Sequence, residues 1–154
     1  MNVVYLVRHG EAQSPMADPQ RGLTERGSAT VQRLGAWASA VFPTVSEIRH
    51  SGKLRAEQTA RILANSFQMN TEPIAVSGLN PNDDVVPVAE SLAGVEHPLM
   101  LVGHLPFLAR LTSCLVVGDP GKAIVDFDTA ALVRLYRDQY GWTIDTVMQP
   151  GGLG

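Results

Sequence analysis

Short apolar runs alternate with amphipathic segments along most of the chain. The runs at 2–7 (NVVYLV) and 98–104 (PLMLVGH) are rich in branched apolar residues, which is typical of strands covered on both faces. Weaker strand candidates lie at 46–51 and 72–79. A chain that alternates strands with helices folds as a mainly parallel sheet with helices on both of its faces.

Four segments between these strands carry apolar residues at helical spacing. The first follows Thr24, a favoured N-cap, and ends before Pro43. The second spans 53–67, Asp84 is expected to cap a short third helix, and the fourth spans 106–118, with a proline at its start and a glycine at its end. The positions expected to face the core in the first helix are Val31, Leu34, Ala38 and Val41.

The last part of the chain has the pattern of a terminal hairpin. The apolar runs AALVRLY and WTIDTVM flank the turn sequence RDQYG, and the final PGGLG is expected to be loose. No repeat, low-complexity tract or linker interrupts the chain, so we expect one domain over residues 1–154. The predicted fold is a three-layer α/β/α sandwich on a mainly parallel central sheet, with an antiparallel addition at the C-terminus.

Composition bounds the partners and the compartment. The 154 residues carry a formal net charge of −3, which gives no support for nucleic acid or an anionic membrane as a partner. A lone cysteine, Cys114, excludes an internal disulfide framework and fits a reducing compartment. The first residues contain neither a basic segment nor a long apolar stretch, so we expect no signal peptide or membrane span and a cytoplasmic location.

Charged and imidazole side chains follow three of the predicted strands. Arg8 and His9 follow the first run, His104 ends the run at 98–104, and Arg55 comes shortly after the strand at 46–51. Because the carboxyl ends of parallel strands meet at one edge of a sheet, we expect these side chains to lie together. Two guanidiniums and two imidazoles would form a pocket for a compact dianion such as phosphate.

A neutral histidine in such a pocket can attack phosphorus and carry the phosphoryl group. For His9, the other ring nitrogen needs an acceptor, and the carbonyl of Gly10 is the candidate. The sequence has no HxxxH or HExxH pair, and nearby arginines would repel a cation, so no metal or other cofactor is expected. A P-loop is absent, and a cysteine-phosphatase loop on Cys114 would need an arginine where Pro120 stands.

Three motifs carry these residues. They are LVRHGEA at 6–12, SGKLRAEQTA at 51–60 and LVGHLP at 101–106. In this order they resemble the motifs of the histidine phosphatase superfamily, the phosphoglycerate mutase-like enzymes. The small size of the chain and the segment RGLTERG at 21–27 resemble most the short SixA-type phosphohistidine phosphatases, which lack the inserted caps of larger members.

The resemblance implies a metal-independent phosphatase. His9 would be the nucleophile and would form a covalent phosphohistidine. The expected ligands are a phosphorylated substrate and the phosphate ion that it releases. The resemblance also implies that three further residues form the phosphate pocket: Arg8, Arg55 and His104.

The roles of four further residues stay open. Arg21, in a predicted loop at 14–22, either reaches the rim of the pocket or only solvates its loop. Larger members of the superfamily supply a general acid, often a Glu, and this sequence has no clear counterpart. Asp83 and Asp84 lie in the matching region, although aspartate is also a favoured helix cap. Glu11, next to the nucleophile, has no assigned role.

The lack of a clear general acid favours one class of substrate. An alkyl ester needs its departing alkoxide protonated, whereas the imidazole of a phosphohistidine is a better leaving group. We therefore expect a phosphohistidine in a protein partner, since a short chain without caps leaves the pocket open to a large substrate. The alternatives are a small-molecule phosphomonoesterase, a phosphoglycerate mutase-like enzyme, or a phosphoprotein-binding module. A binding module would need the cations but not His9.

Overall fold

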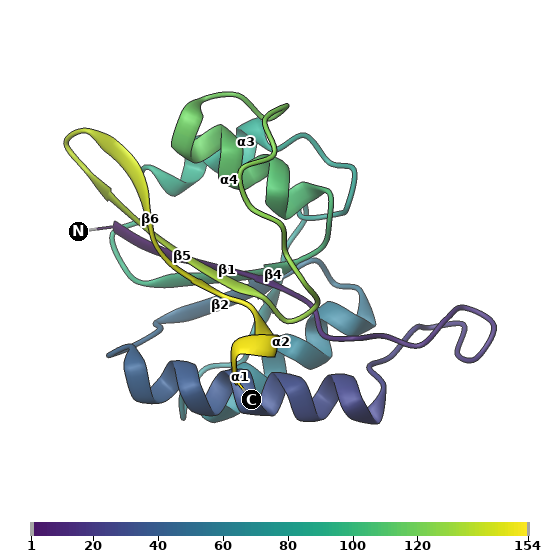
Figure 1. Cartoon of the computed structure of the whole chain (residues 1–154). Coiled ribbons are helices and arrows are strands. Elements are labelled where there is room, and N and C mark those ends of the chain that lie inside the picture. The colour runs from purple at the N-terminus through teal and green to yellow at the C-terminus, as the bar shows by residue number, and fades with distance from the viewer. Residues whose placement is uncertain (1, 154) are drawn as a thin grey trace.

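A computed structural model describes residues 2–153. One six-stranded sheet has α3 and α4 on one face and α1 and α2 on the other (Figure 1). None of the helices within residues 2–153 is long and apolar enough to cross a membrane. The elements in chain order are β1 (Asn2–Arg8), α1 (Glu25–Val41), β2 (Glu47–His50), α2 (Leu54–Ser66), β3 (Ile74–Ala75), α3 (Val86–Leu92), β4 (Leu99–Gly103), α4 (Phe107–Val117), β5 (Leu132–Asp138), β6 (Gly141–Met148) and the 3-10 helix η1 (Pro150–Leu153).

The strand order β3-β2-β4-β1-β5-β6 confirms the predicted fold class. Strands β1 to β4 pair in parallel, and β5 and β6 add to β1 in antiparallel fashion. Met100 in the middle of β4 faces Tyr5 of β1 on one side and Ile48 of β2 on the other. The three strands that precede the predicted pocket residues are therefore neighbours.

Strand β1 is buried on both faces. Tyr5 and Val7 belong to the core under α1 and α2, whereas Val4 and Leu6 belong to the core under α3 and α4. Successive side chains of a strand point to opposite faces, and all four of these are at most 1% exposed. Burial on both faces explains why the run reads as continuously apolar rather than alternating.

Helix α1 begins as predicted. The Thr24 side chain accepts a hydrogen bond from the N–H of Gly27 (2.9 Å). The prediction that Val41 faces the core is wrong: it is 54% exposed. The helix ends there, and Phe42 turns inward to pack edge-on against Tyr5, with the ring centroids 5.3 Å apart. The other three predicted core positions are fully buried: Val31, Leu34 and Ala38.

Two further expectations need correction. The strand expected over 72–79 shortens to Ile74–Ala75, because it lies at the edge of the sheet with both side chains exposed and little apolar surface to bury. The C-terminal segment is not loose over its described part. Residues 150–153 form η1, and Leu153 packs against the core under α1 and α2.

Candidate active site

The predicted pocket residues meet at the carboxyl edge of β1 and β4. His9 follows β1 and His104 follows β4, and the N–H of His9 donates to the carbonyl of Gly103 (3.0 Å). The two imidazole rings have centroids 5.1 Å apart and planes inclined by 53°. Arg8 ends β1 and Arg55 lies in the first turn of α2, and both guanidiniums act electrostatically on His9.

His9 is held by the backbone that follows it. Its Nδ1 lies 2.7 Å from the carbonyl oxygen of Gly10, the acceptor that the sequence predicted. An N–H at Nδ1 leaves the lone pair on Nε2. The N–H of Gly10 in turn donates to the hydroxyl of Thr59 (3.0 Å), which donates to the carbonyl of Arg55 (2.8 Å). These bonds link the His9 turn to the helix that carries Arg55.

The surroundings keep His9 neutral. Burial lowers its pKa to about 4. The Gly10 carbonyl acts in the opposite direction, and the positive charges of Arg55, Arg8 and Arg21 lower the pKa further. At neutral pH the ring therefore carries a free lone pair, which a nucleophile requires.

His104 is 1% exposed and is oriented by a serine. Its Nε2 lies 2.6 Å from the hydroxyl oxygen of Ser51, which also accepts the N–H of Lys53 (3.3 Å). Since that oxygen already accepts from a backbone N–H, its own hydrogen is free to bond Nε2, and the ring proton then sits on Nδ1. Burial lowers the pKa of His104 to about 3, and electrostatic interactions with His9, Arg55, Lys53 and Arg21 lower this pKa further.

Three buried nitrogens mark the site as one for an anion. Within residues 2–153, the fully buried side-chain polar atoms without a hydrogen-bond partner are Nε of Arg8, Nε of Arg55 and Nδ1 of His104. All three belong to residues that the motifs singled out. Buried donors require acceptors, and a phosphoryl group offers several charged oxygens to guanidinium N–H groups. Burial lowers the pKa of both arginines, yet a guanidinium stays charged in proteins.

Arg21 lies beside the pocket. Its charge contributes to the lowered pKa values of His9, Arg55 and His104. The residue adopts a positive φ of 53°, and its Nε donates to the carbonyl of Gln13 (3.1 Å). A left-handed conformation is unfavourable for a residue other than glycine, so the loop holds this guanidinium at the rim against a local conformational cost.

Asp83 and Asp84 both form local hydrogen bonds in the turn before α3. The Asp83 carboxylate accepts the N–H of Asn80 (2.9 Å), and that of Asp84 accepts the N–H of Val86 (3.0 Å) at the start of α3. Among the hydrogen bonds and ion pairs of residues 2–153, neither carboxylate contacts His9. In the same part of the chain, no three His, Cys, Asp or Glu side chains gather into a metal-ligand set.

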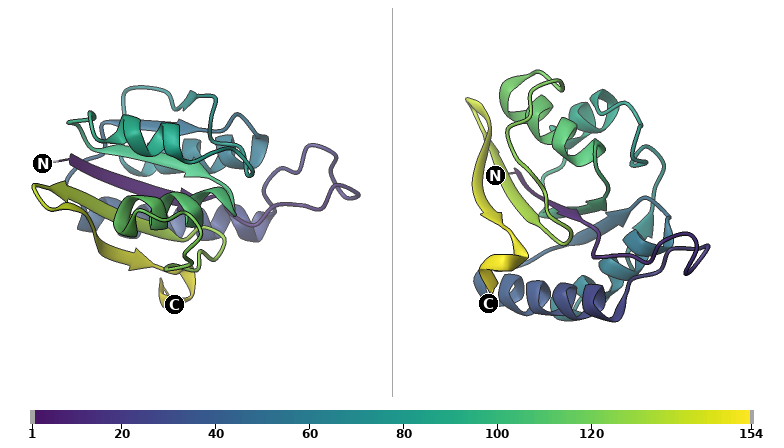
Figure 2. Two further views of the ribbon diagram at one scale, coloured as in Figure 1. Left: turned by 90° about the horizontal axis from the view of Figure 1, so that it is seen from above. Right: turned by 45° about the vertical axis from the view of Figure 1, so that its right-hand side comes forward.

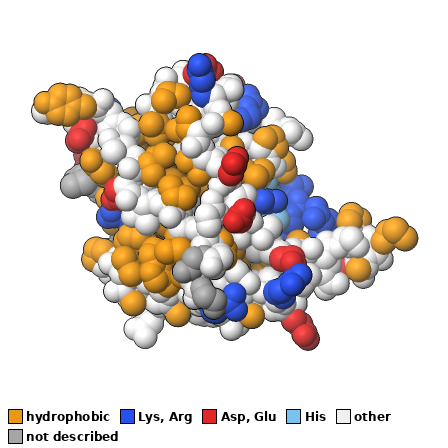
Figure 3. Space-filling model, viewed as in Figure 1, with side chains coloured by type: hydrophobic (Ala, Val, Ile, Leu, Met, Phe, Trp, Pro, Cys, Tyr) orange, Lys and Arg blue, Asp and Glu red, His pale blue; other side chains and the backbone are white. Residues whose placement is uncertain are grey.

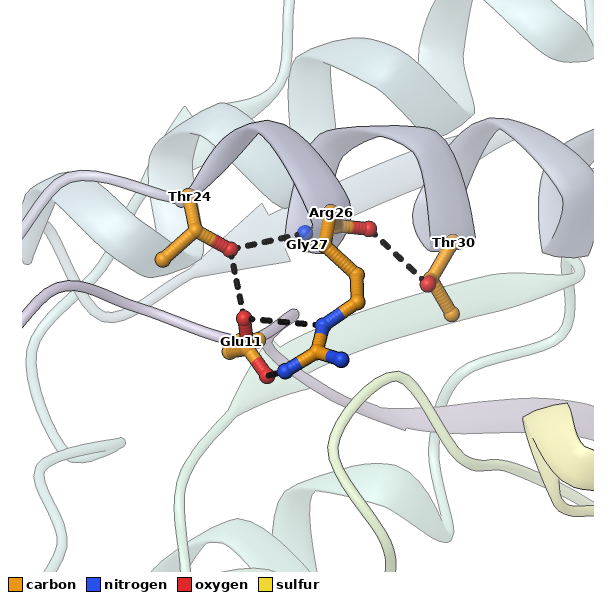
Figure 4. Close-up of polar contacts among 5 residues, drawn as sticks. All are labelled: Glu11, Thr24, Arg26, Gly27 and Thr30. Atoms are coloured by element: carbon orange, nitrogen blue, oxygen red, sulfur yellow. Dashed lines mark hydrogen bonds and ion pairs between the residues drawn. The ribbon is translucent and has the colours of Figure 1, made fainter.

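Glu11 joins the His9 turn to the start of α1 (Figure 4). Its carboxylate accepts the hydroxyl of Thr24 (2.8 Å) and the Nη2 of Arg26 (3.2 Å), and these hydrogen bonds lower the pKa of Glu11. The packing behind it is close, because a Cβ at Gly27 would lie 2.1 Å from the Glu11 carbonyl oxygen. Glu11, which the sequence left without a role, thus makes structural contacts with the start of α1.

Sequence reasoning missed three polar residues around the pocket. Ser51, Lys53 and Thr59 all lie within the second motif, at 51–60. Thr59 follows Arg55 by four residues, the spacing of one helical turn, and that spacing was the available sign of its contact. Ser51 follows the end of β2, which places it beside the end of the neighbouring strand β4.

Comparison with known proteins assigns the chain to a family. The family model of the histidine phosphatase superfamily (branch 1) matches residues 4–80, half of the chain. The chain therefore belongs to the histidine phosphatase superfamily, and it is a phosphatase of that class.

Individual relatives extend the match beyond residue 80. The phosphohistidine phosphatase SixA of Escherichia coli (strain K12) is 26% identical over 156 aligned positions, which cover 97% of this chain and 95% of that protein. A solved structure of the protein histidine phosphatase SixA complexed with tungstate superposes with a TM-score of 0.86, 26% identity and 99% coverage of both chains. A phosphoserine phosphatase of Entamoeba histolytica, 12% identical with a TM-score of 0.74 over 97% of this chain and 98% of that chain, shares the fold.

Proposed function

We propose that this phosphatase removes the phosphoryl group from a phosphohistidine carried by a protein partner, through a covalent intermediate on His9 and without a metal ion. The observation that carries the proposal is the setting of His9. Its Nδ1 bonds the Gly10 carbonyl at 2.7 Å, its pKa is lowered to about 4, and positive charges of Arg8, Arg55 and Arg21 surround it. A neutral nucleophile among cations suits attack on a phosphoryl dianion.

The reaction has two balanced steps. In the first, the lone pair of His9 Nε2 forms a bond to phosphorus while the P–N bond of the substrate breaks; the electron pair stays on the departing imidazole nitrogen, which takes up a proton from solvent. In the second, a water oxygen bonds to phosphorus and the P–Nε2 bond breaks. Its electron pair returns to His9, and the proton lost by water passes to solvent. The cations stabilise the charge on the transferring group throughout.

Two observations favour phosphohistidine as the substrate. Asp83 and Asp84 are engaged in the turn before α3, and an imidazole leaving group places less demand on a general acid than an alkoxide does. A relative similar over nearly its whole length is named a phosphohistidine phosphatase. The tungstate complex of SixA supports an oxyanion site in the corresponding fold.

We also propose that residues 1–154 act as one domain in the cytoplasm. A single sheet carries both pocket histidines at its edge. Cys114, the lone cysteine of the sequence, fits a reducing compartment.

The test is a substrate panel with the purified chain. The panel holds several proteins phosphorylated on histidine with phosphoramidate, together with phosphotyrosine, sugar phosphates and phosphoglycerate. We expect the highest kcat/KM for one of the histidine-phosphorylated proteins. Higher turnover of sugar phosphates or phosphoglycerate, with none of phosphohistidine, would refute the substrate assignment.

The intermediate is tested separately by rapid denaturation. The enzyme is mixed briefly with ³²P-labelled substrate, denatured in alkali, and separated from the substrate by size. We expect acid-labile label on the enzyme; wild-type enzyme that turns over without any label would refute the covalent step. A metal chelator should leave the rate unchanged, and orthovanadate should inhibit as a mimic of five-coordinate phosphorus.

A further inference from the structure

Residues 11–24 form an arm that leaves the body of the molecule beside the pocket and returns to the start of α1 (Figure 2). Its two ends are joined across the base. The N–H of Thr24 donates to the carbonyl of Glu11 (3.0 Å), and the N–H of Gln13 donates to that of Gly22 (2.9 Å). Between these bonds, Ala12 and Leu23 form an isolated β-bridge. The arm is therefore a closed, hairpin-like projection.

The tip of the arm is exposed and partly apolar. Residues 14–17 (SPMA) are all exposed, and Met16 is 97% exposed, the most exposed of the large hydrophobic side chains within residues 2–153. In Figure 3, hydrophobic side chains gather at the end of the arm, and Lys, Arg and His side chains gather where it joins the body. A methionine adapts readily to an apolar partner surface. A single exposed hydrophobic residue is ordinary. The case for Met16 as a binding residue therefore depends on the structure of the arm that carries it.

Hydrogen bonds hold the tip in one conformation. The Asp18 carboxylate accepts the N–H of Gln20 (3.1 Å) and the N–H of Gly22 (2.8 Å). The N–H of Asp18 donates to the carbonyl of Ser14 (2.9 Å). The arm also contacts α2, because the Gln58 side chain accepts the N–H of Leu23 (2.7 Å). When a side chain on an ordered backbone binds a partner, less backbone conformational entropy is lost than when the loop itself must become ordered.

The other end of the arm belongs to the pocket. Arg21 is held at a φ of 53° by the loop, and its charge acts on both His9 and His104. Strained backbone at a functional site is often part of how the site is positioned. The arm thus connects a cation at the phosphate pocket with an exposed methionine five residues away in the chain.

We propose that the tip of the arm, centred on Met16, is a docking contact for the phosphohistidine-carrying protein; this inference rests on the proposed function. The arm projects away from the sheet and its helices (Figures 1 and 2). A phosphorylated small molecule in the pocket would not extend along it, whereas a folded protein that presents its phosphohistidine to His9 would. The partner would place an apolar hollow against Met16 while its phosphoryl group meets the arginines. The arm would therefore act on the choice of substrate rather than on the chemical step.

The test compares two substrates for one variant. The large substrate is the histidine-phosphorylated protein of the panel with the highest kcat/KM for the wild type, and the small substrate is p-nitrophenyl phosphate. For Met16→Asp we expect kcat/KM on the protein to fall about tenfold, mainly through KM, since a carboxylate in an apolar contact is unfavourable. Activity on p-nitrophenyl phosphate should stay within about twofold. Met16→Leu should keep activity on the protein substrate close to that of the wild type.

Tyr140 provides a matched control. It is 88% exposed and lies in the turn between β5 and β6, at the other end of the molecule from the arm (Figure 1). Tyr140→Asp introduces the same charge on another highly exposed residue, so it tests a general effect of charge on the protein substrate. We expect Tyr140→Asp to leave both activities unchanged.

Each remaining outcome decides one of the two claims. A wild type that hydrolyses p-nitrophenyl phosphate but no histidine-phosphorylated protein refutes the proposed function. A wild type that hydrolyses the protein substrate, with Met16→Asp equally active on it, leaves the proposed function standing and refutes the docking contact. Equal losses on both substrates also refute docking. So does a wild-type dimer on gel filtration that Met16→Asp converts to a monomer, because the tip would then bind a second copy of the chain.

Discussion

The pocket floor and the arm are built in opposite ways. The floor consists of His9, His104, Arg8 and Arg55, and both histidines are less than 10% exposed. Three of these residues lie at the ends of paired strands, and Arg55 lies in the first turn of α2. The arm is one continuous segment, residues 11–24, closed by its own hydrogen bonds and exposed at its tip. The residues proposed for the chemistry lie in the floor, whereas the proposed docking contact lies at the tip of the arm.

The backbone of His9 is bonded to the segments on both sides of β1. The N–H of His9 donates to Gly103 at the end of β4, and its carbonyl accepts the N–H of Ala130 just before β5, both at 3.0 Å. The position of the His9 backbone is therefore held by the segments that flank β1 on both sides within the sheet. Within residues 2–153, Arg21 is the one residue of the arm whose charge lowers the pKa values of His9 and His104. Changes in the floor should therefore affect every substrate, and changes in the arm should affect substrates unequally.

The largest effect is expected for His9→Asn. Asparagine has a similar size and an amide that can still donate to the Gly10 carbonyl, but it lacks a nucleophilic nitrogen. Loss of a covalent nucleophile lowers kcat on the order of 10³-fold or more. We expect this loss on the protein substrate and on p-nitrophenyl phosphate alike, with no label retained after rapid denaturation. His97→Asn is the control, because His97 is 47% exposed and pairs with Glu47.

Undiminished turnover in His9→Asn would show that His9 is not the nucleophile and that the floor is not the catalytic site. Circular dichroism and the urea midpoint of the variant should match the wild type closely enough to exclude unfolding.

The next largest effect separates two arginines. Arg55 in the floor has a buried Nε without a partner, whereas Nε of Arg21 in the arm bonds Gln13. Lysine keeps the charge but loses the planar fork. We expect Arg55→Lys to lower kcat about 100-fold, the size of effect seen when one preorganised donor to the transition state is lost. Arg21→Lys should lower kcat/KM about tenfold or less.

Steady-state kinetics on p-nitrophenyl phosphate measures both arginine variants under the same conditions. Equal losses in kcat would show that Arg21 belongs to the floor and that the division into floor and arm is wrong. A larger loss of kcat for Arg21→Lys than for Arg55→Lys would mean that Arg21 contributes more to the chemical step than Arg55 does.

The floor was predictable from the sequence because two local patterns agree on it. Branched apolar runs predict buried parallel strands, and the residues after three of them carry matching chemistry. The parallel pairing of β1, β4 and β2 then brings His9 and His104 together without any further assumption. The carbonyl of Gly10 could be named in advance, since it is adjacent to His9 in the chain.

The arm was not predictable in the same way. The segment at 14–22 shows only prolines and a glycine, which predict a loop but no conformation. Its shape depends on the two bonds accepted by Asp18 and on Gln58, 35 residues after Leu23. The same limit applies to Ser51, whose contact with His104 joins two strands. Such pairings follow from tertiary structure, and a pattern along the chain does not specify them.

The acid titration of His9 provides a finer test of the floor. Its pKa is lowered to about 4, chiefly by burial, whereas an unfolded histidine titrates near 6.5. Between those two pH values the unfolded chain binds more protons than the folded one, so the free energy of unfolding falls as the pH drops through this window. The neutral nucleophile persists down to about pH 4, and below that kcat/KM should decline about tenfold per pH unit.

Proton NMR of the imidazole rings measures this titration directly, with the His9 signals assigned by their absence in His9→Asn. A midpoint near 6.5 in the free enzyme would show that the ring is charged in the pocket at neutral pH, which contradicts the role of His9 as a preformed nucleophile.

The smallest effect tests whether the base of the arm supports the floor. Thr24 caps α1 through Gly27 and donates to Glu11, so Thr24→Ala removes both contacts; loss of such a cap lowers the free energy of unfolding by about 1 kcal/mol. Thr30 is the matched control, since its hydroxyl donates to the carbonyl of Arg26 within the same helix (2.9 Å) (Figure 4). Thr30→Ala should change the free energy of unfolding by less than about 0.5 kcal/mol.

Urea denaturation measures the stability of both threonine variants, and kcat on p-nitrophenyl phosphate measures the state of the floor. Because Gly103 and Ala130 bond the backbone of His9 independently of the arm, kcat in Thr24→Ala should stay within about twofold of the wild type. A tenfold loss of kcat at full folding would mean that Glu11 and Thr24 hold the His9 turn in place. The floor would then end at the first turn of α1 and not at the edge of the sheet.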